Sequence, residues 1–222
     1  MAEKSKNLRP QLLTPGFLYK NRYTPDRFDT NIEFVNLDVE QAVYISSLPQ
    51  IASSFGVWPK GNKRVLYLLA DVVGYMISVP KLGSRNQKRW VSIDEFIEAF
   101  GIDNFARYEA VVLVADKVAV DNGRGSSILH DISRELAAQN SYGIRIVGAS
   151  ASVHYSPRHD GEGQDFTLAS FGPEMFSFVT TNRNADLVQG SHKPPAVPPS
   201  GNRNMAWNTI RHSGIVSRGF SL

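Results

Sequence analysis

The segment DNGRGSS, residues 121–127 of this 222-residue chain, combines the residue types with the most evident chemical potential. It follows a run typical of a buried strand and precedes a run with the apolar spacing of a helix. In that position the backbone N–H groups of a glycine-rich turn can surround a phosphate, and an arginine can add positive charge. The pattern predicts a phosphate or nucleotide site made of Gly123, Arg124, Gly125 and Ser126.

A structural turn is the alternative interpretation of the same segment. The segment lacks the GK[ST] ending of a P-loop. In a structural turn the glycines take positive φ or allow close approach, and Ser126 or Ser127 caps the following helix. We favour this interpretation. A nucleotide is kept as a hypothesis, and no other cofactor is expected.

Other groups of chemically capable residues lack the spacing that their chemistry needs. Five side chains could ligate a metal, but they lie in a glycine-rich stretch without recognised ligand spacing: His154, His159, Asp160, Glu162 and Asp165. The chain has no cysteine, which excludes disulfides, thiolate catalysis and cysteine-containing zinc sites. It also has no G-x-S-x-G motif. We therefore expect no metal site and no enzymatic activity.

The segment KLGSRNQKRW, residues 81–90, mixes cations with Trp90, as surfaces that grip nucleic acid do. An exposed hairpin or strand-to-helix loop has the same composition. We favour the loop because residues 31–180 carry 13 Lys and Arg against 17 Asp and Glu, a net charge of −4 that would repel a polyanion. Nucleic acid is therefore not an expected partner.

Alternating and helical patterns predict the elements that position these residues. We expect a helix over 38–48 followed by a turn or short helix, then one long or two short strands over 63–80. Ser92 and Glu95 form a capping-box pattern that starts an amphipathic helix, which Gly101 can end.

The second half of the body is expected to alternate in the same way. A largely buried strand should span 108–120, a helix 127–139, a half-exposed strand 142–155, and the last strand material 166–181. The expected fold class is α+β and mostly β, with a β-sandwich-like sheet core, two or three helices, and extended N- and C-terminal arms. The expected domains are an N-terminal arm (1–30), one β-rich globular domain (31–180) and a basic Pro/Gly-rich C-terminal extension (181–222).

The two arms differ from the body in charge. Residues 1–30 have six basic and three acidic side chains, and residues 181–222 have five and one, so the arms sum to 3 + 4 = +7. Cationic arms and an anionic body attract each other, which predicts an assembly role. Aromatic, apolar and arginine side chains that could anchor such interfaces are Tyr19, Arg22, Tyr23, Arg27, Phe28, Trp207, Ile210 and Phe220.

The order of elements resembles that of the cypovirus polyhedrins. The resemblance rests on an N-terminal segment rich in Arg, Tyr, Phe and Asn (GFLYKNRYTPDRF), strand pairs ending in a short helix (WVSIDEFIEAF), a Tyr-rich strand, a second helix and paired strands. It covers about residues 15–170, but the chain is shorter than typical members and lacks their cysteines and long C-terminal region. It implies a β-sandwich with an N-terminal arm that docks on neighbouring subunits.

The resemblance also implies a function, namely a viral structural protein that self-assembles into an occlusion-body crystal. Its partners would be further copies of itself, with virus particles as cargo, inside inclusion bodies in the host cell cytoplasm. An icosahedral viral capsid protein is the first alternative, and a nucleotide-dependent enzyme using residues 121–127 is the second. The absence of an N-terminal apolar segment, and of any run of about 18 apolar residues, predicts an intracellular protein without a membrane partner.

Alkali should dissolve such an assembly. The chain has 9 Lys and 8 Tyr, which titrate near pH 10 to 10.4, so their full deprotonation would move the net charge from +3 to 3 − 9 − 8 = −14. Subunits of like charge would then repel one another.

Overall fold

The computed structural model describes residues 22–23, 31–37, 48–81, 87–121, 123, 125–157, 164–169 and 176–192. Its helices are α4 (Leu48–Phe55), α5 (Ile93–Phe100), α6 (Ile102–Phe105) and α7 (Ile128–Ala138). Its strands are β1 (Arg22–Tyr23), β2 (Ile32–Asn36), β3 (Arg64–Leu69), β4 (Val72–Val73), β5 (Met76–Pro80), β6 (Lys88–Ser92), β7 (Tyr108–Val114), β8 (Arg145–Ala149), β9 (Ser152–Pro157), β10 (Gln164–Ala169), β11 (Phe176–Thr181) and β12 (Leu187–His192).

One seven-stranded sheet organises the fold, in the order β1-β2-β3-β7-β8-β11-β12. Strands β2, β3, β7 and β8 are parallel neighbours, whereas β1, β11 and β12 join antiparallel at the two sides. A three-stranded sheet (β4-β5-β6) and the hairpin β9–β10 are separate from it. The central strands therefore form a parallel core, which needs apolar cover on both faces.

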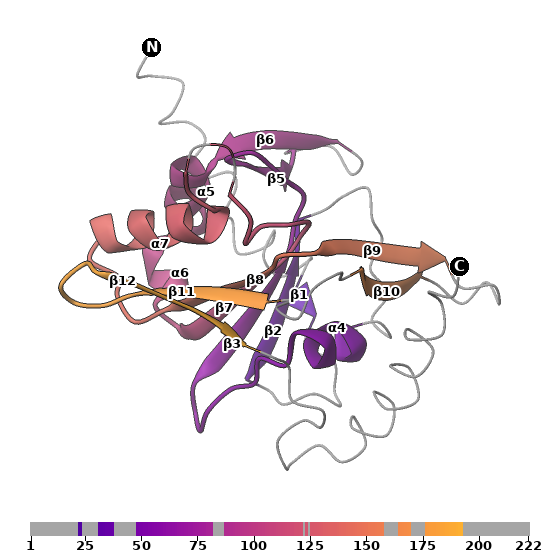
Figure 1. Ribbon diagram of the computed structural model, residues 1–222, viewed down its shortest axis with the longest axis horizontal. Coiled ribbons are helices and arrows are strands. Elements are labelled where there is room, and N and C mark those ends of the chain that lie inside the picture. The colour runs from indigo at the N-terminus through magenta and orange to yellow at the C-terminus, as the bar shows by residue number, and fades with distance from the viewer. Residues whose placement is uncertain are drawn as a thin grey trace.

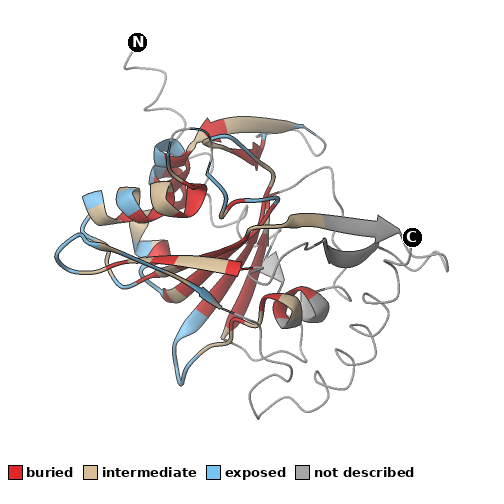
Figure 2. Cartoon of the chain, viewed as in Figure 1, coloured by how far each residue is buried: buried red, intermediate tan, exposed pale blue. Residues whose placement is uncertain are grey.

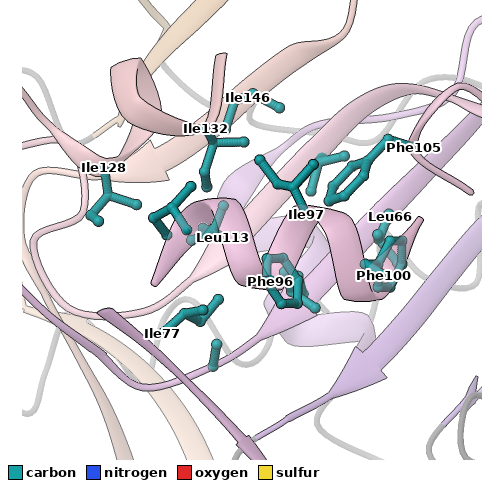
Figure 3. Packing of buried hydrophobic residues seen from close by; sticks show 14 of the residues in the cluster. Leu66, Ile77, Phe96, Ile97, Phe100, Phe105, Leu113, Ile128, Ile132 and Ile146 are labelled. Atoms are coloured by element: carbon teal, nitrogen blue, oxygen red, sulfur yellow. The ribbon is translucent and has the colours of Figure 1, made fainter. Parts of the chain in front are cut away.

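Helices supply much of that cover (Figure 1). Helices α5, α6 and α7 lie over one face, where one apolar cluster gathers, and α4 lies over the other, where a second cluster gathers. Figure 2 shows the central strands buried, while the outer sides of α5 and α7 reach solvent. In the first cluster, Phe96, Phe100 and Phe105 pack together, with ring centroids 4.7–6.2 Å apart (Figure 3).

The predictions for the two amphipathic helices are confirmed. In α5, Ser92 Oγ accepts from Glu95 N while the Glu95 carboxylate accepts from Ser92 N, so both halves of the capping box form. Gly101 follows α5 with φ 87°, a conformation that favours glycine. In α7, the apolar side of the helix is buried as expected, with Ile128, Leu129, Ile132 and Leu136 inside.

Two predicted strands are shorter than expected. The 108–120 strand ends at Val114, and residues 115–120 turn instead. The run 142–155 divides into β8, which is buried and parallel to β7, and β9, which leaves the large sheet to pair with β10. The run 63–80, predicted as one long or two short strands, forms three strands: β3 in the large sheet, and β4 and β5 in the small sheet, joined by a turn containing Gly74 (φ 59°). It ends at Pro80 as predicted.

The mixed, mostly β content with few helices matches the predicted fold class. On one face of the large sheet, α5, α6 and α7 share the cover with the three-stranded sheet, whose Ile77, Val79 and Val91 belong to the first cluster, and on the other face α4 contributes to the second cluster. Parallel strands cannot be joined by tight turns, so their crossovers bring helices onto the faces. The sheet also continues past residue 180 to His192, because β12 pairs with β11. The short-helix alternative after residue 48 is realised as α4, and the helix predicted over 38–48 otherwise lies outside the described residues.

Candidate ligand-binding cleft

The carboxyl ends of the parallel strands are aligned in one row. Asn36 of β2 pairs in register with Leu69 of β3, and Leu69 with Val114 of β7. Two residues beyond this row stand Asp71 after β3 and Asp116 after β7. In open sheets with helices on both faces, ligands bind in crevices outside the carboxyl ends of the strands. A ligand-binding site is therefore expected at these loops.

A cleft of about 300 Å³ lies at this edge. The loops that follow β3 and β7, together with the first residue of α7, line it: Val72, Gly74, Asp116, Lys117, Val118, Val120, Asp121 and Ile128. Its walls combine two carboxylates and one ammonium with four aliphatic side chains. An apolar lining with a few polar groups is typical of small-ligand sites, and this volume stands at the small end of their range.

One apolar side chain of the cleft lining is substantially exposed. The described residues include three large hydrophobic side chains that are substantially exposed, and Val120, at 44%, lines the cleft. Val73, at 61%, lies between the lining residues Val72 and Gly74. Val120 therefore adds exposed apolar surface to the cleft, whereas Val118 and Ile128 of the lining are buried.

Hydrogen bonds join the segment that carries Asp116 and Lys117 to the end of β8 and the start of β9. Lys117 N donates to Ala151 O (3.1 Å) and Ala119 N donates to Ala149 O (3.1 Å). The Asp116 carboxylate accepts from Val153 N through Oδ1. Lys117 has φ 49°, a left-handed conformation that costs a residue with a Cβ about 1–2 kcal/mol. Such strain persists only where the surroundings enforce it, as these hydrogen bonds do.

Gly148 of β8 allows this close packing. A Cβ built at Gly148 would overlap Val118 Cγ2 and would stand 2.9 Å from Leu129 Cδ2, well inside the ordinary carbon–carbon contact of about 3.5–4.0 Å. The missing side chain therefore lets the cleft segment and the start of α7 settle directly on the strand.

The glycine-rich loop takes the form of a turn organised by its own aspartate. Asp121 Oδ1 accepts from Gly123 N (2.8 Å) and from Gly125 N (3.0 Å). Both glycines have positive φ, 83° and 73°. The two amides that would surround a phosphate thus already donate to a carboxylate. Arg124 lies outside the described residues.

The N-terminus of α7 also has internal partners. Ser127 occupies the N-cap position, without a capping hydrogen bond from its side chain, and its Oγ lies 2.9 Å from His130 Nδ1. Ser126 Oγ donates to Asp131 Oδ1 (3.0 Å), and Arg134 donates to both of these oxygens. Asp131 supplies the negative charge that a helix N-terminus favours. The loop and the first turn of α7 thus present carboxylates where the phosphate hypothesis requires free donors.

The described part of the basic segment, Lys81 and residues 87–90, lies at the ends of β5 and β6 beside the cleft loops. β5 and β6 pair antiparallel, and Lys88 Nζ lies 3.0 Å from Asp71 Oδ2 and 5.5 Å from the Trp90 ring centroid. Lys88 therefore neutralises the carboxylate that follows β3. The net charge of the cleft lining comes from Asp116, Asp121 and Lys117 and equals −1.

The remaining predicted site residues are placed as follows. Arg22 and Tyr23 form β1, whose backbone adds an edge strand beside Val35 and Phe34 of β2. The other predicted assembly residues lie outside the described residues: Tyr19, Arg27, Phe28, Trp207, Ile210 and Phe220. The described residues hold no group of three or more His, Cys, Asp or Glu side chains arranged for a metal. None of the helices described has the length and apolar character that crossing a membrane requires.

Asp116 and Lys117 were missed from the sequence because the strand predicted over 108–120 ran straight through them. A signal was present in the repeated endings YLLAD and VLVAD, which place Asp71 and Asp116 at the same offset from two buried runs. The ending FVNLD carries Asp38 at the same offset after β2, outside the described residues.

No protein-family model matches the chain, and no curated protein matches it either. The geometry of the described residues therefore carries the functional argument.

Proposed function

We propose that this protein binds a small, neutral, hydroxyl-bearing ligand of the nucleoside class in the cleft at the carboxyl ends of β3 and β7. The single observation that carries the proposal is the position and lining of that cleft. It lies where open sheets with parallel strands bind ligands, and its loops come from two such strands.

The charges of the lining favour a ligand that donates hydrogen bonds. Asp116 and Asp121 are acceptors, and each carboxylate offers about four lone-pair positions, of which the hydrogen bonds to Oδ1 use only some. Sugar hydroxyls are suitable donors, and carboxylates hold ribose hydroxyls in other open sheets of this kind. The aliphatic walls can cover the face of a base.

The same charges disfavour a polyphosphate. The lining has a net charge of −1, and the amides of Gly123 and Gly125 already donate to Asp121. Phosphates bind where free N–H groups and positive charge converge. A nucleoside is therefore expected to bind better than its triphosphate, and the proposal concerns binding rather than a reaction.

Isothermal titration with adenosine tests the proposal, with ATP as the comparison. Asp116→Asn keeps an acceptor oxygen for Val153 N but removes the charge, and hydrogen bonds to charged groups contribute about 1.5–3 kcal/mol. Adenosine affinity should fall about tenfold or more. Asp103→Asn, an exposed change on α6 away from the lining, is the matched control and should leave affinity unchanged. Equal loss in both variants, or tighter binding of ATP than of adenosine, would contradict the proposal.

As a second function, we propose that the chain is a structural protein that self-assembles. Within this function we favour an occlusion-body protein, and a viral capsid protein is the alternative. Two features support it: the charge contrast between the basic chain ends and the acidic body, and an uncharged strand, β12, at the edge of the sheet. In that role the protein would lie in inclusion bodies in the host cytoplasm and hold virus particles.

Electron microscopy of the purified chain tests this second function. Because β1 pairs with β2, the N-terminal truncation should remove residues 1–21 and keep Arg22 and Tyr23. Ordered particles or crystals from the full chain, lost in the truncated chain, would support an assembly role for the arm. Particles that form equally well without residues 1–21 would exclude that role.

A further inference from the structure

Strand β12 is an edge with an unusual composition. Among the described strands its one neighbour is β11, and its sequence, LVQGSH, contains no Asp, Glu, Lys, Arg or Pro. Edge strands normally carry charges, prolines or bulges that prevent pairing with other chains. Val188, the second residue of the strand, is 52% exposed. β12 therefore lacks these protective features.

The pairing of β11 shows which backbone groups of β12 face outward. Gly143 N donates to Thr181 O on the β8 side, whereas Asn182 N donates to Asp186 O on the β12 side. Backbone groups alternate between the two sides of an antiparallel strand. Thr180, Phe178 and Phe176 therefore bond to β12. The backbone N–H and C=O groups of their partners Val188, Gly190 and His192 face β11. The N–H and C=O groups of Leu187, Gln189 and Ser191 are therefore directed away from β11, toward the outer side of the sheet.

We infer that β12 pairs antiparallel with β12 of a second copy of this chain, about a two-fold axis at Gln189, to form one continuous sheet. With the axis at Gln189, each outward-facing residue meets another outward-facing residue: Gln189 faces Gln189 of the second copy, and Leu187 faces Ser191. The register is thus self-complementary, as a two-fold interface requires. The inference deepens the second function proposed above by naming a surface and its register.

Side chains across the axis also match. Val188 would lie opposite Gly190 of the second copy. Gly190 has no side chain because a Cβ there would stand 2.6 Å from Phe178 Cζ, so the Phe178 ring already covers that position. The exposed valine would then pack beside this ring, and aromatic with β-branched pairs stabilise neighbouring strands. No charge on either strand opposes the pairing.

A structured turn holds β12 ready for this contact. Asn182 Oδ1 accepts from Asn184 N (2.9 Å) and from Asp186 N (3.0 Å), and Ala185 takes φ 61° in the same turn. The hairpin register is therefore set before any second copy arrives, which lowers the ordering cost of association.

Light scattering after size-exclusion chromatography of the full chain tests the inference. The wild-type chain should have twice the chain mass at micromolar concentration. Gln189→Pro removes an outward N–H without removing a bond to β11 and should give the single chain mass, whereas Gln189→Ala should stay dimeric. Val188→Glu provides a second test that does not depend on the folding of Gln189→Pro. It places like charges from the two copies near the axis and should also give the single chain mass.

Cross-linking tests the register. The chain has no cysteine, so Gln189→Cys introduces one thiol, and a short bifunctional maleimide should join two copies, while Asp103→Cys should not be joined. A wild-type chain that is monomeric at all concentrations would overturn both this inference and the self-assembly function. Larger particles that form equally well with Gln189→Pro would overturn the β12 inference alone.

Discussion

Replacing Gly148 by alanine should destabilise the protein by loosening the segment that carries the cleft. The new methyl group would overlap Val118 Cγ2 and approach Leu129 Cδ2 to 2.9 Å. Overpacking of this kind costs about 1–3 kcal/mol. Alanine recovers about 0.4–1 kcal/mol by restricting the unfolded chain, and Gly148 does not have the positive φ that would add strain. The net loss should be about 1–2 kcal/mol.

Thermal and urea unfolding measure this loss. At about 2–4 °C per kcal/mol for a chain of this size, the midpoint temperature should fall by about 2–8 °C. Val118→Ala alone should also destabilise, because it removes two buried methyl groups beside the strand.

The double variant identifies the cause. In Gly148→Ala combined with Val118→Ala, the added methyl can occupy space that the valine vacated, so the loss should be smaller than the sum of the single losses by about 0.5–2 kcal/mol. A Gly148→Ala chain as stable as wild type, or strictly additive losses, would refute the packing argument.

Burial raises the pKa of Tyr67 above its ordinary value, so the unfolded chain releases this proton first. The free energy of unfolding should therefore be constant below pH 10 and fall above it, and Tyr67→Phe should reduce this fall in urea unfolding at pH 9–11. At pH 7 the same change should lower the free energy of unfolding by about 1–2 kcal/mol, because Val57 O loses its 2.8 Å donor. Ser92→Ala should lower the free energy of unfolding by about 1 kcal/mol, and Ser92→Asp should lower it much less, because a carboxylate can still cap α5. Equal losses for the two variants in urea unfolding would contradict this. Tyr108→Phe should cost about 1–3 kcal/mol, since the Tyr108 hydroxyl donates to the buried Glu33 carboxylate that also pairs with Arg64 at 2.8 Å; an unchanged urea midpoint would exclude that contribution.

Tyr67 also bears on the expected alkaline dissolution of an assembly. Its phenol donates to Val57 O and Ala52 O inside the cluster beneath α4, so deprotonation would place a charge among apolar side chains. Loss of turbidity above pH 10 could therefore come from unfolding of the chain itself. Tyr67→Phe separates the two causes, because dissolution by subunit repulsion should persist in that variant.

The sequence predicted the elements whose signals are local. The capping box at Ser92 and the apolar spacing of α7 lie within single turns of helix, so periodicity alone reveals them. The parallel order of β2, β3, β7 and β8 depends on which distant strands pair, and alternation carries no such information. β8 was mistaken for a half-exposed strand because Ile144, Arg145 and Ile146 alternate between apolar and polar, although residues 146–149 are all buried.

The strand β12 and the cleft were missed for related reasons. LVQGSH lacks apolar alternation, and it forms a strand because the Asn182–Asp186 turn returns the chain alongside β11. Asp116 and Lys117 follow an apolar run without a glycine or proline to mark its end, so the predicted strand continued through them. The glycines of residues 121–127 were recognised as turn residues, but the role of Asp121 in accepting from their amides became visible only in the structure.

Nuclear magnetic resonance mapping of adenosine binding tests the central claim most directly. Backbone amide signals would be followed in the wild-type chain during titration. The account predicts shifts confined to residues 72–74 and 116–121 and to the first turn of α7, all lost in Asp116→Asn. Shifts centred on the basic segment of residues 81–90, or no shifts at millimolar adenosine, would contradict the claim that this cleft binds a nucleoside-class ligand.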